Sequence, residues 1–259
     1  MLIDIHNHTP LCNHATGIPE EFIKKAIDKG IDIYGFADHA PMDFDKKYRM
    51  GFEDMPKYEN EINALKEKYK DKIKILLGYE VDFTPFIDKR VLERKVDFLI
   101  GSVHFLNNWG FDNPEFIKEW GKRDIDDVYK EYFSKIKEMA ESKLFDIVGH
   151  LDLVKVFGFK PKKNIKDLAK EAIKAIKKSD MAVEINTSGL RKKVNEIYPS
   201  VELLRIIKEE GIDITFSSDA HKPQDVGYKI TQAVELAKKI GFSEAVYFEK
   251  RKKQKIKLT

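Results

Sequence analysis

The sequence predicts an α/β fold in which parallel strands form a closed or nearly closed β/α barrel. Three observations support this. Seven short apolar segments are rich in β-branched residues, helical segments with an apolar face separate them, and no stretch rich in proline, glycine or serine divides the chain. Strands that alternate with helices form βαβ units and a parallel sheet. We therefore expect one domain over residues 1–259, with an open, doubly wound sheet as the alternative.

The expected strands are defined by their apolar, β-branched composition. They cover Leu2–Ile5, Ile31–Ala37, Ile73–Glu80, Val96–Val103, Phe145–Gly149, Met181–Asn186 and Asp213–Ser217. The clearest amphipathic helices between them cover Glu20–Lys29, Tyr58–Tyr69, Asp127–Lys143, Ile165–Lys178 and Val201–Glu210. Gly30 and Gly211 directly follow helical segments, as expected of residues that end a helix. Seven strands with helical crossovers are one strand short of the common eight-stranded barrel.

Composition excludes several classes of protein. The 47 basic and 44 acidic residues nearly balance, which does not indicate a nucleic-acid-binding surface. No apolar run approaches the roughly 20 residues of a membrane span, and the first residues resemble a strand rather than a signal peptide. The single cysteine, Cys12, excludes an intramolecular disulfide and suits the reducing cytoplasm. We interpret the basic run Lys250–Lys255 as a solvated end.

The seven histidines are placed unusually. Each lies at or just beyond the C-terminal end of an expected strand, and these ends share the face of a barrel that carries active sites. The residues are His6, His8, His14, His39, His104, His150 and His221. A single histidine at a strand end is more often structural than a metal ligand. All seven at one face of the barrel indicate a metal centre.

Two acidic residues complete the expected centre. Glu80 ends the third strand, and Asp219 follows the seventh. Strand side chains alternate, so His6 and His8 point the same way, as do Asp219 and His221. Imidazole nitrogens mixed with carboxylate oxygens suit Zn, Mn or Fe, and nine ligands exceed the needs of one ion. We therefore predict two or three divalent ions with a bridging carboxylate.

Three neighbouring residues have less certain roles in this prediction. Asp4 and Asp38 are expected to orient ligand imidazoles or to form structural hydrogen bonds. Cys12, close in sequence to the first histidines, is expected to be a buried thiol beside the site, with a ligand role as the alternative.

These motifs together resemble the polymerase-and-histidinol-phosphatase superfamily and, within it, the histidinol-phosphate phosphatases. The resemblance covers nearly the whole chain. It rests on the segments 6–15, 38–41, 78–82, 100–104, 149–152, 184–191 and 218–221. It implies a distorted (β/α)7 TIM-like barrel. It also implies three groups of ligands: His6, His8, Glu80 and Asp219; Glu80, His104 and His150; and His14, His39 and His221.

The resemblance further implies hydrolysis of L-histidinol phosphate to L-histidinol and phosphate, in histidine biosynthesis. A metal-bridging hydroxide is expected to attack the phosphomonoester, with Glu80 and Asp219 holding the ions. Arg191, in the loop after the sixth strand, is the first candidate for phosphate binding, and Lys155 is the second. A surface position for Arg191 is the alternative.

Long loops are expected above the same face. Their aromatic residues, Phe44, Tyr48, Phe52, Trp109, Phe111 and Trp120, are candidates to enclose an imidazole ring. Four acidic residues are candidates to meet the substrate ammonium: Asp43, Asp45, Glu53 and Asp54. The sequence does not decide among them.

Two other functions remain open at this point. One is a broader phosphatase or phosphodiesterase acting on nucleotides, and the other is a metal-binding module without turnover. The expected partner is a small phosphomonoester, with no nucleic acid and no membrane. The metal, the oligomeric state and the acid that protonates the leaving group remain open.

Overall fold

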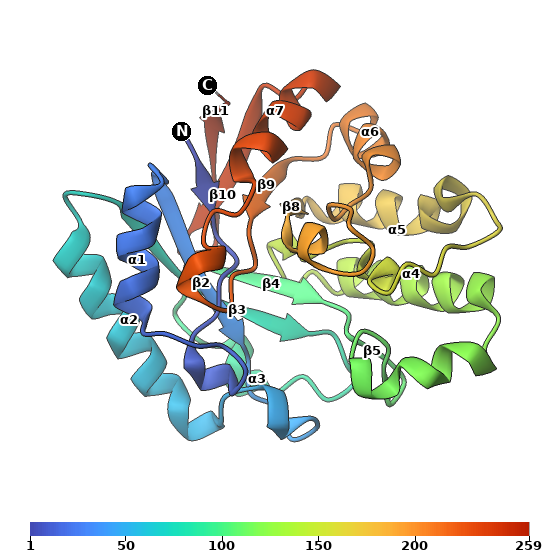
Figure 1. Cartoon of the computed structure of the whole chain (residues 1–259), viewed down its shortest axis with the longest axis horizontal. Coiled ribbons are helices and arrows are strands. Elements are labelled where there is room, and N and C mark those ends of the chain that lie inside the picture. The colour runs from blue at the N-terminus through green and yellow to red at the C-terminus, as the bar shows by residue number, and fades with distance from the viewer. Residues whose placement is uncertain (259) are drawn as a thin grey trace.

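The computed structural model describes residues 1–258 and contains a seven-stranded parallel sheet in the order β1-β2-β3-β4-β7-β8-β9 (Figure 1). The seven strands are β1 (Ile3–Asp4), β2 (Ile33–His39), β3 (Lys74–Asp82), β4 (Phe98–Ser102), β7 (Ile147–Val148), β8 (Ala182–Asn186) and β9 (Ile214–Ser217). Every neighbouring pair in this order is parallel. Each expected strand is therefore present, in its expected place along the chain.

The first and last strands of the sheet lie next to each other. The Ile5 amide donates to the Phe216 carbonyl at 3.2 Å, the His8 amide donates to the Ala220 carbonyl at 2.9 Å, and Asn7 forms a parallel bridge with Ala220. The sheet thus nearly closes into a barrel. The predicted seven-stranded barrel is confirmed, and the open doubly wound sheet is excluded.

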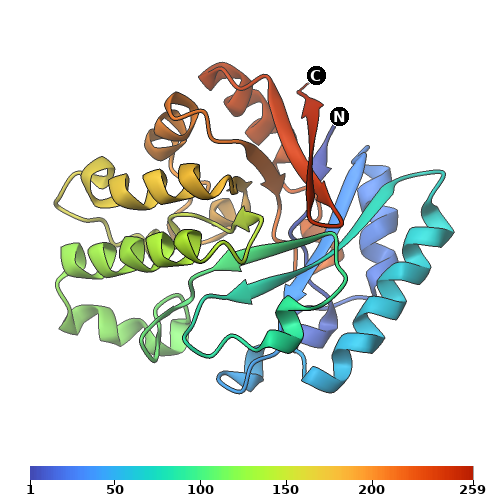
Figure 2. The ribbon, with the colours of Figure 1, turned by 180° about the vertical axis from the view of Figure 1, so that it is seen from behind.

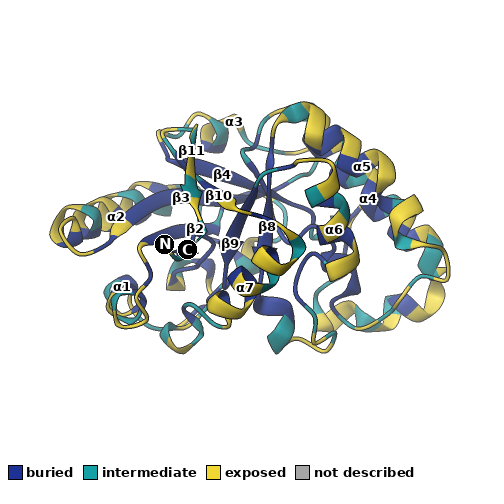
Figure 3. Ribbon diagram, turned by 90° about the horizontal axis from the view of Figure 1, so that it is seen from above, coloured by how far each residue is buried: buried dark blue, intermediate teal, exposed yellow. Residues whose placement is uncertain are grey.

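Helices surround the strands. They are α1 (Pro19–Asp28), α2 (Met55–Tyr69), α3 (Lys89–Leu92), α4 (Ile125–Ser142), α5 (Ile165–Ser179), α6 (Val201–Glu209) and α7 (Ile230–Ile240). Figure 3 shows buried strands at the centre and helices whose outer surfaces are exposed. Buried apolar residues from Ile3 to Phe248 form one cluster, which supports our proposal that residues 1–259 are one domain.

Two connections differ from the simple β/α pattern. Between β3 and β4 the only α-helix is α3, so the expected helical crossover is reduced there to a helix of 4 residues. Between β4 and α4 the chain inserts the short hairpin β5 (Phe105–Leu106) and β6 (Trp109–Gly110), followed by the 3-10 helix η4 (Pro114–Lys122). This insertion stands at the C-terminal end of β4, beside the predicted site.

The basic run near the C-terminus is not a free, solvated end. Residues Glu244–Glu249 (β10) and Lys252–Lys257 (β11) form an antiparallel hairpin, visible in red from behind in Figure 2. The expectation failed because Lys252–Lys257 pair with β10 along their whole length. Ile256 packs against the core, and basic side chains meet aspartates.

Those aspartates directly precede strands of the barrel. Arg251 pairs with Asp146 before β7, and Lys253 pairs with Asp213 before β9 at 2.9 Å. Asp97, before β4, accepts the Lys250 amide. The hairpin therefore covers the N-terminal end of the barrel, opposite the predicted site. Within residues 1–258, no helix has the length and apolar character needed to cross a membrane.

A substitution of Asp97 tests whether this residue holds the C-terminal hairpin to the barrel. Its buried carboxylate accepts from the Leu77 amide at 2.9 Å, the Lys66 ammonium at 2.6 Å and the Lys250 amide at 3.2 Å. Asp97→Ala leaves these donors without their partner. We expect the free energy of unfolding to fall by about 2–4 kcal/mol in urea denaturation.

The matched control is Glu67→Ala, which removes an exposed carboxylate from α2 that pairs with Lys70. A change within about 0.5 kcal/mol is expected there. Equal stability of the two variants would show that Asp97 does not hold the hairpin to the barrel.

Candidate metal centre

The carboxylate of Glu80 lies at the centre of the predicted ligands. It is only 1% exposed, and five imidazoles from four segments face it. The distances to its two oxygens are 3.2 Å for His6 Nε2, 3.8 Å for His8 Nε2, 2.9 Å for His39 Nδ1, 3.5 Å for His104 Nε2 and 2.9 Å for His150 Nε2. The first three face Oε2 and the last two face Oε1. This is the arrangement expected of a bridging carboxylate.

The remaining predicted ligands lie on one side of this group. Asp219 Oδ1 is 3.2 Å from His8 Nε2 and 3.5 Å from His221 Nδ1. The His14 and His221 rings are 4.7 Å apart, and the His14 and His39 rings are 5.2 Å apart, between centroids. All nine predicted ligands are thus brought together at the C-terminal ends of the strands.

Four sets of three side chains present ligand atoms within 4.8 Å of one another. They are His6, His8 and Glu80; Glu80, His104 and His150; His14, His39 and His221; and His8, Cys12 and His221. The first three sets support the grouping implied by the family resemblance, which we carry forward as a proposal. Burial raises the pKa of the Cys12 thiol, which opposes a thiolate ligand in the fourth set.

Unpaired nitrogen atoms indicate that cations belong here. Among the described residues, His6 Nε2, His8 Nε2, His39 Nδ1 and His150 Nδ1 are buried without a hydrogen-bond partner. Three of these nitrogens nevertheless face carboxylate oxygens at 3.2 Å or less. Nitrogen and oxygen lone pairs directed into one small volume fit divalent metal ions of the zinc type.

Outer carboxylates orient three of the imidazoles. Glu184 in β8 accepts from His6 Nδ1 at 2.7 Å, Asp82 in β3 accepts from His104 Nδ1 at 2.8 Å, and Asp38 lies 3.3 Å from His8 Nδ1. Each contact leaves the opposite nitrogen free for a metal ion.

The sequence analysis anticipated Asp38 but missed Glu184 and Asp82. Asp82 lies two residues after Glu80, on the same side of β3, so strand periodicity would have found it. Asp4, the other candidate, accepts from the Ser218 amide at 2.8 Å and the Gly227 amide at 2.8 Å. It joins the two ends of the sheet and does not orient a ligand.

The side chains of the centre control one another's charge. Burial alone would raise the pKa of Glu80, but His6, His39 and His104 hold it well below its usual range. Burial would lower the pKa of His104, yet Asp82 and Glu80 raise it to about 10. Burial lowers the pKa of His39 to about 3, which keeps that imidazole neutral and able to bind a metal.

Two ligands have an uncommon backbone conformation. His150 has φ 22° and Asp219 has φ 52°, a region that non-glycine residues rarely occupy. Contacts with neighbouring side chains maintain both. The His150 amide donates to Glu184 at 2.7 Å, and Arg191 Nη2 donates to the Asp219 carbonyl at 3.1 Å. Strain of this kind is typical of functional sites.

Gly149 allows a further contact with Glu80. A Cβ atom at position 149 would lie 2.5 Å from Ser102 Oγ. The absence of a side chain there leaves room for the Ser102 hydroxyl, which donates to Glu80 Oε1 at 2.6 Å. The glycine before His150 is thus required by the close packing under the centre.

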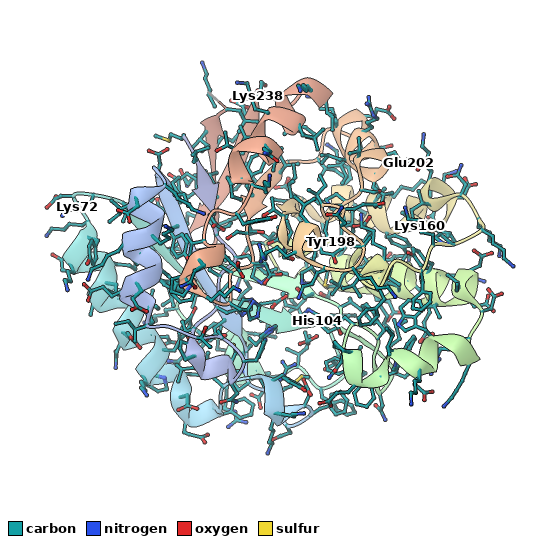
Figure 4. All side chains as sticks on the ribbon, in the orientation of Figure 1. Lys72, His104, Lys160, Tyr198, Glu202 and Lys238 are labelled. Atoms are coloured by element: carbon teal, nitrogen blue, oxygen red, sulfur yellow. The ribbon has the colours of Figure 1, made fainter. Side chains whose placement is uncertain are left out.

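The centre forms the floor of a cavity of about 580 Å³. In Figure 4, His104 lies near the middle of the molecule, whereas Lys160 and Glu202 lie at its periphery. Arg191, on the 3-10 helix η6 (Ser188–Arg191), lines the cavity. Its Nη2 donates to the Ser218 carbonyl at 2.8 Å, and its Nη1 is buried without a partner. One edge of the guanidinium is therefore available to an anion.

Lys155 has a different environment. Its ammonium is buried and lies 2.9 Å from Asp152 Oδ2, 3.3 Å from Glu196 Oε2 and 2.7 Å from the Ile197 carbonyl. Lys155 is not one of the described residues that line the cavity. Because these partners already satisfy the ammonium, we do not place Lys155 in the phosphate site.

The loops at the C-terminal end of the barrel contribute fewer of the expected aromatic residues to the cavity lining than the sequence suggested. Tyr48 lines the cavity, whereas Trp109, Phe111 and Trp120 are buried in the core and do not. Phe44 and Phe52 do not line it either. Phe105 and Phe116, which the sequence analysis did not name, do so instead. Of the four acidic candidates for the ammonium, only Asp45 reaches the cavity.

Comparisons with known proteins agree with this geometry. Residues 4–188 match the PHP domain family. A Deinococcus radiodurans protein described as a "Probable histidinol-phosphatase" is 40% identical over 98% of both chains. The histidinol-phosphatase of Bacillus subtilis is 31% identical over 87% of this chain and 95% of its own.

The chain belongs to the PHP family and, within it, to the histidinol-phosphatases. A solved member of this family has the same fold over its full length. The Lactococcus lactis histidinol phosphate phosphatase, in complex with zinc, L-histidinol and phosphate, matches with a TM-score of 0.83. The match covers 98% of both chains at 25% identity. The bound zinc of that histidinol-phosphatase agrees with the nitrogen and oxygen ligands found here.

Glu184 offers a test of the metal centre in this histidinol-phosphatase family member. Glu184→Gln removes the charge that orients His6 and holds the His150 amide. We expect zinc affinity, measured by competition with a chromophoric chelator, to fall by about 10- to 100-fold.

Glu202→Gln is the control, because Glu202 is an exposed residue of α6 at the periphery of Figure 4. Its zinc affinity should equal that of the unaltered protein. If Glu184→Gln also binds zinc as tightly as the unaltered protein, Glu184 does not support the centre.

Proposed function

We propose that this protein hydrolyses L-histidinol phosphate to L-histidinol and phosphate, a reaction of histidine biosynthesis. The observation that carries this proposal is the full-length match to histidinol-phosphatases, one of which binds zinc, L-histidinol and phosphate. The cluster around Glu80 supports the same chemistry independently, because it gathers nine nitrogen and oxygen ligands beside an arginine.

Nine side chains would hold two or three divalent ions, Zn, Mn or Fe. His6, His8, Glu80 and Asp219 would bind one ion, Glu80 with His104 and His150 a second, and His14, His39 and His221 a third. When bound, the ions supply Lewis acidity and a water whose pKa is lowered towards neutrality. Glu80 and Asp219 carry the negative charge that retains the ions.

Arg191 is the proposed phosphate-binding residue. Its free Nη1 and its position on the cavity wall support contact with the non-reacting phosphoryl oxygens. A guanidinium binds such oxygens through two parallel hydrogen bonds, and its charge offsets the charge that builds up during hydrolysis. Ser188, which donates to Asp219 Oδ2 at 3.1 Å, positions that carboxylate next to the arginine.

The setting of the protein is part of the same proposal. We place the enzyme in the cytoplasm, which the unpaired thiol of Cys12 supports. We expect no nucleic-acid partner, because the basic side chains of the C-terminal hairpin pair with aspartates.

The decisive experiment measures phosphate release from L-histidinol phosphate, p-nitrophenyl phosphate and AMP, with the metal content of the same sample. We expect kcat/KM for histidinol phosphate to exceed the other two by about 100-fold, with two or three ions per chain. Removal of metal by a chelator should abolish turnover, and zinc or manganese should restore it. Preference for AMP would indicate the broader phosphatase, and full metal without turnover the non-catalytic module.

Arg191→Ala tests the phosphate site. Loss of the guanidinium should lower kcat/KM for histidinol phosphate by about 100- to 1,000-fold, and Arg191→Lys should lie between the two.

The control is Arg205→Ala, on the exposed side of α6, with unchanged kinetics expected. Metal content must be measured as well, because Arg191 also holds the Asp219 carbonyl. Unchanged kinetics of Arg191→Ala at full metal content would exclude Arg191 from the phosphate site.

A further inference from the structure

Five carboxylates line the cavity, and four of them already face basic or imidazole side chains. Glu80 and Asp219 belong to the metal centre. Asp45 lies 3.1 Å from Arg49 Nη2, and Asp225 lies 3.6 Å from Arg191 Nε. The fifth is Asp112, whose carboxylate has no ion pair or hydrogen bond to another side chain among the described residues.

Asp112 stands on the insertion between β4 and α4. It follows the β5–β6 hairpin and precedes η4, and it lines the cavity together with His104 and His150. The side chain is partly buried, and burial raises the pKa of its carboxyl group. Its carboxylate is attracted electrostatically by the imidazoles of His104 and His150 but forms no ion pair with either, so it can bind a cationic group of a ligand in the cavity.

The substrate of the proposed function carries such a group. L-histidinol phosphate has an ammonium on the carbon next to the CH2–O–P group, so the ammonium lies close to the phosphorus. With the phosphate at the metal centre and Arg191, the ammonium must meet the cavity wall near the cluster. Asp112 lies on the His104 side of the cluster and, of the described carboxylates that line the cavity, is the one without an ion pair.

The same wall offers apolar surface for the rest of the substrate. Phe105 and Phe116 line the cavity beside Asp112, and Phe116 is 46% exposed although it is a large apolar side chain. An ammonium partner flanked by aromatic rings matches an amino alcohol that carries an imidazole ring.

We propose that Asp112 is a specificity-determining residue that binds the substrate ammonium and so selects amino-alkyl phosphates over phosphomonoesters without an amino group. This inference rests on the proposed function and adds to it the residue that recognises the leaving alcohol. Asp112 does not take part in breaking the phosphoester bond, so its removal affects recognition and leaves hydrolysis itself intact.

The test compares L-histidinol phosphate with imidazolylpropyl phosphate, the analogue that lacks the amino group. The unaltered, metal-loaded enzyme should prefer histidinol phosphate by about 10- to 100-fold in kcat/KM. Asp112→Asn should reduce this preference to about one, with kcat/KM for the analogue changed by less than about threefold. Asp43→Asn is the matched control, because Asp43 is 82% exposed and outside the cavity lining, and it should keep the full preference.

Several results would overturn the proposal. They are an undiminished preference in Asp112→Asn, no preference in the unaltered enzyme, or an equal loss of kcat/KM for both substrates at full metal content. If Asp112→Asn does not fold, as judged by its melting temperature, Asp112→Ala is measured by the same criteria.

Failure of the proposed function gives a different result. The unaltered enzyme would then hydrolyse p-nitrophenyl phosphate but not histidinol phosphate. In that case ethanolamine phosphate and ethyl phosphate replace the two substrates. A preference for ethanolamine phosphate that Asp112→Asn removes supports the ammonium site, and the absence of such a preference overturns it.

Discussion

The structure depends on one buried negative charge, the carboxylate of Glu80. A charge at 1% exposure is costly unless partners surround it, and here five imidazoles from four segments do so. Those partners approach a single carboxylate only if the ends of their strands converge. The need to surround the buried Glu80 carboxylate with imidazoles therefore accounts both for the closed, parallel arrangement of the strands and for the placement of the histidines at their ends.

The two ends of the barrel have different roles. At the C-terminal end, Glu184, Asp82 and Asp38 orient imidazoles, and unusual backbone conformations persist at His150 and Asp219. At the N-terminal end, aspartates that precede strands accept from backbone amides and pair with the basic hairpin. Such an arrangement lets the stable end offset the strain at the reactive end.

The sequence predicted the features that repeat with a regular period. The seven strands followed from β-branched segments, and the clustering of the nine proposed ligands followed from the rule that strand ends share one face. The hairpin at Lys252–Lys257 was missed because Ile256 is the one apolar residue of this strand, so no apolar alternation marks it. The surroundings of Lys155 could not be predicted, because only the folded chain brings Glu196 and the Ile197 carbonyl to its ammonium. Asp112 lies in an insertion without periodicity, so the sequence carried no signal that set it apart from Asp43 or Asp45.

The difference between the regular strands and the irregular insertion bears on how such enzymes choose substrates. A metal centre and an arginine recognise the phosphoryl group, which every phosphomonoester shares, so they do not distinguish one leaving alcohol from another. Discrimination must come from residues that touch the alcohol, and here the insertion between β4 and α4 contributes Phe105, Asp112 and Phe116 to the cavity wall. Because this insertion lies outside the seven strands, it can vary without disturbing the ligands around Glu80. We therefore assign the chemistry to the barrel and propose that this insertion sets the substrate preference.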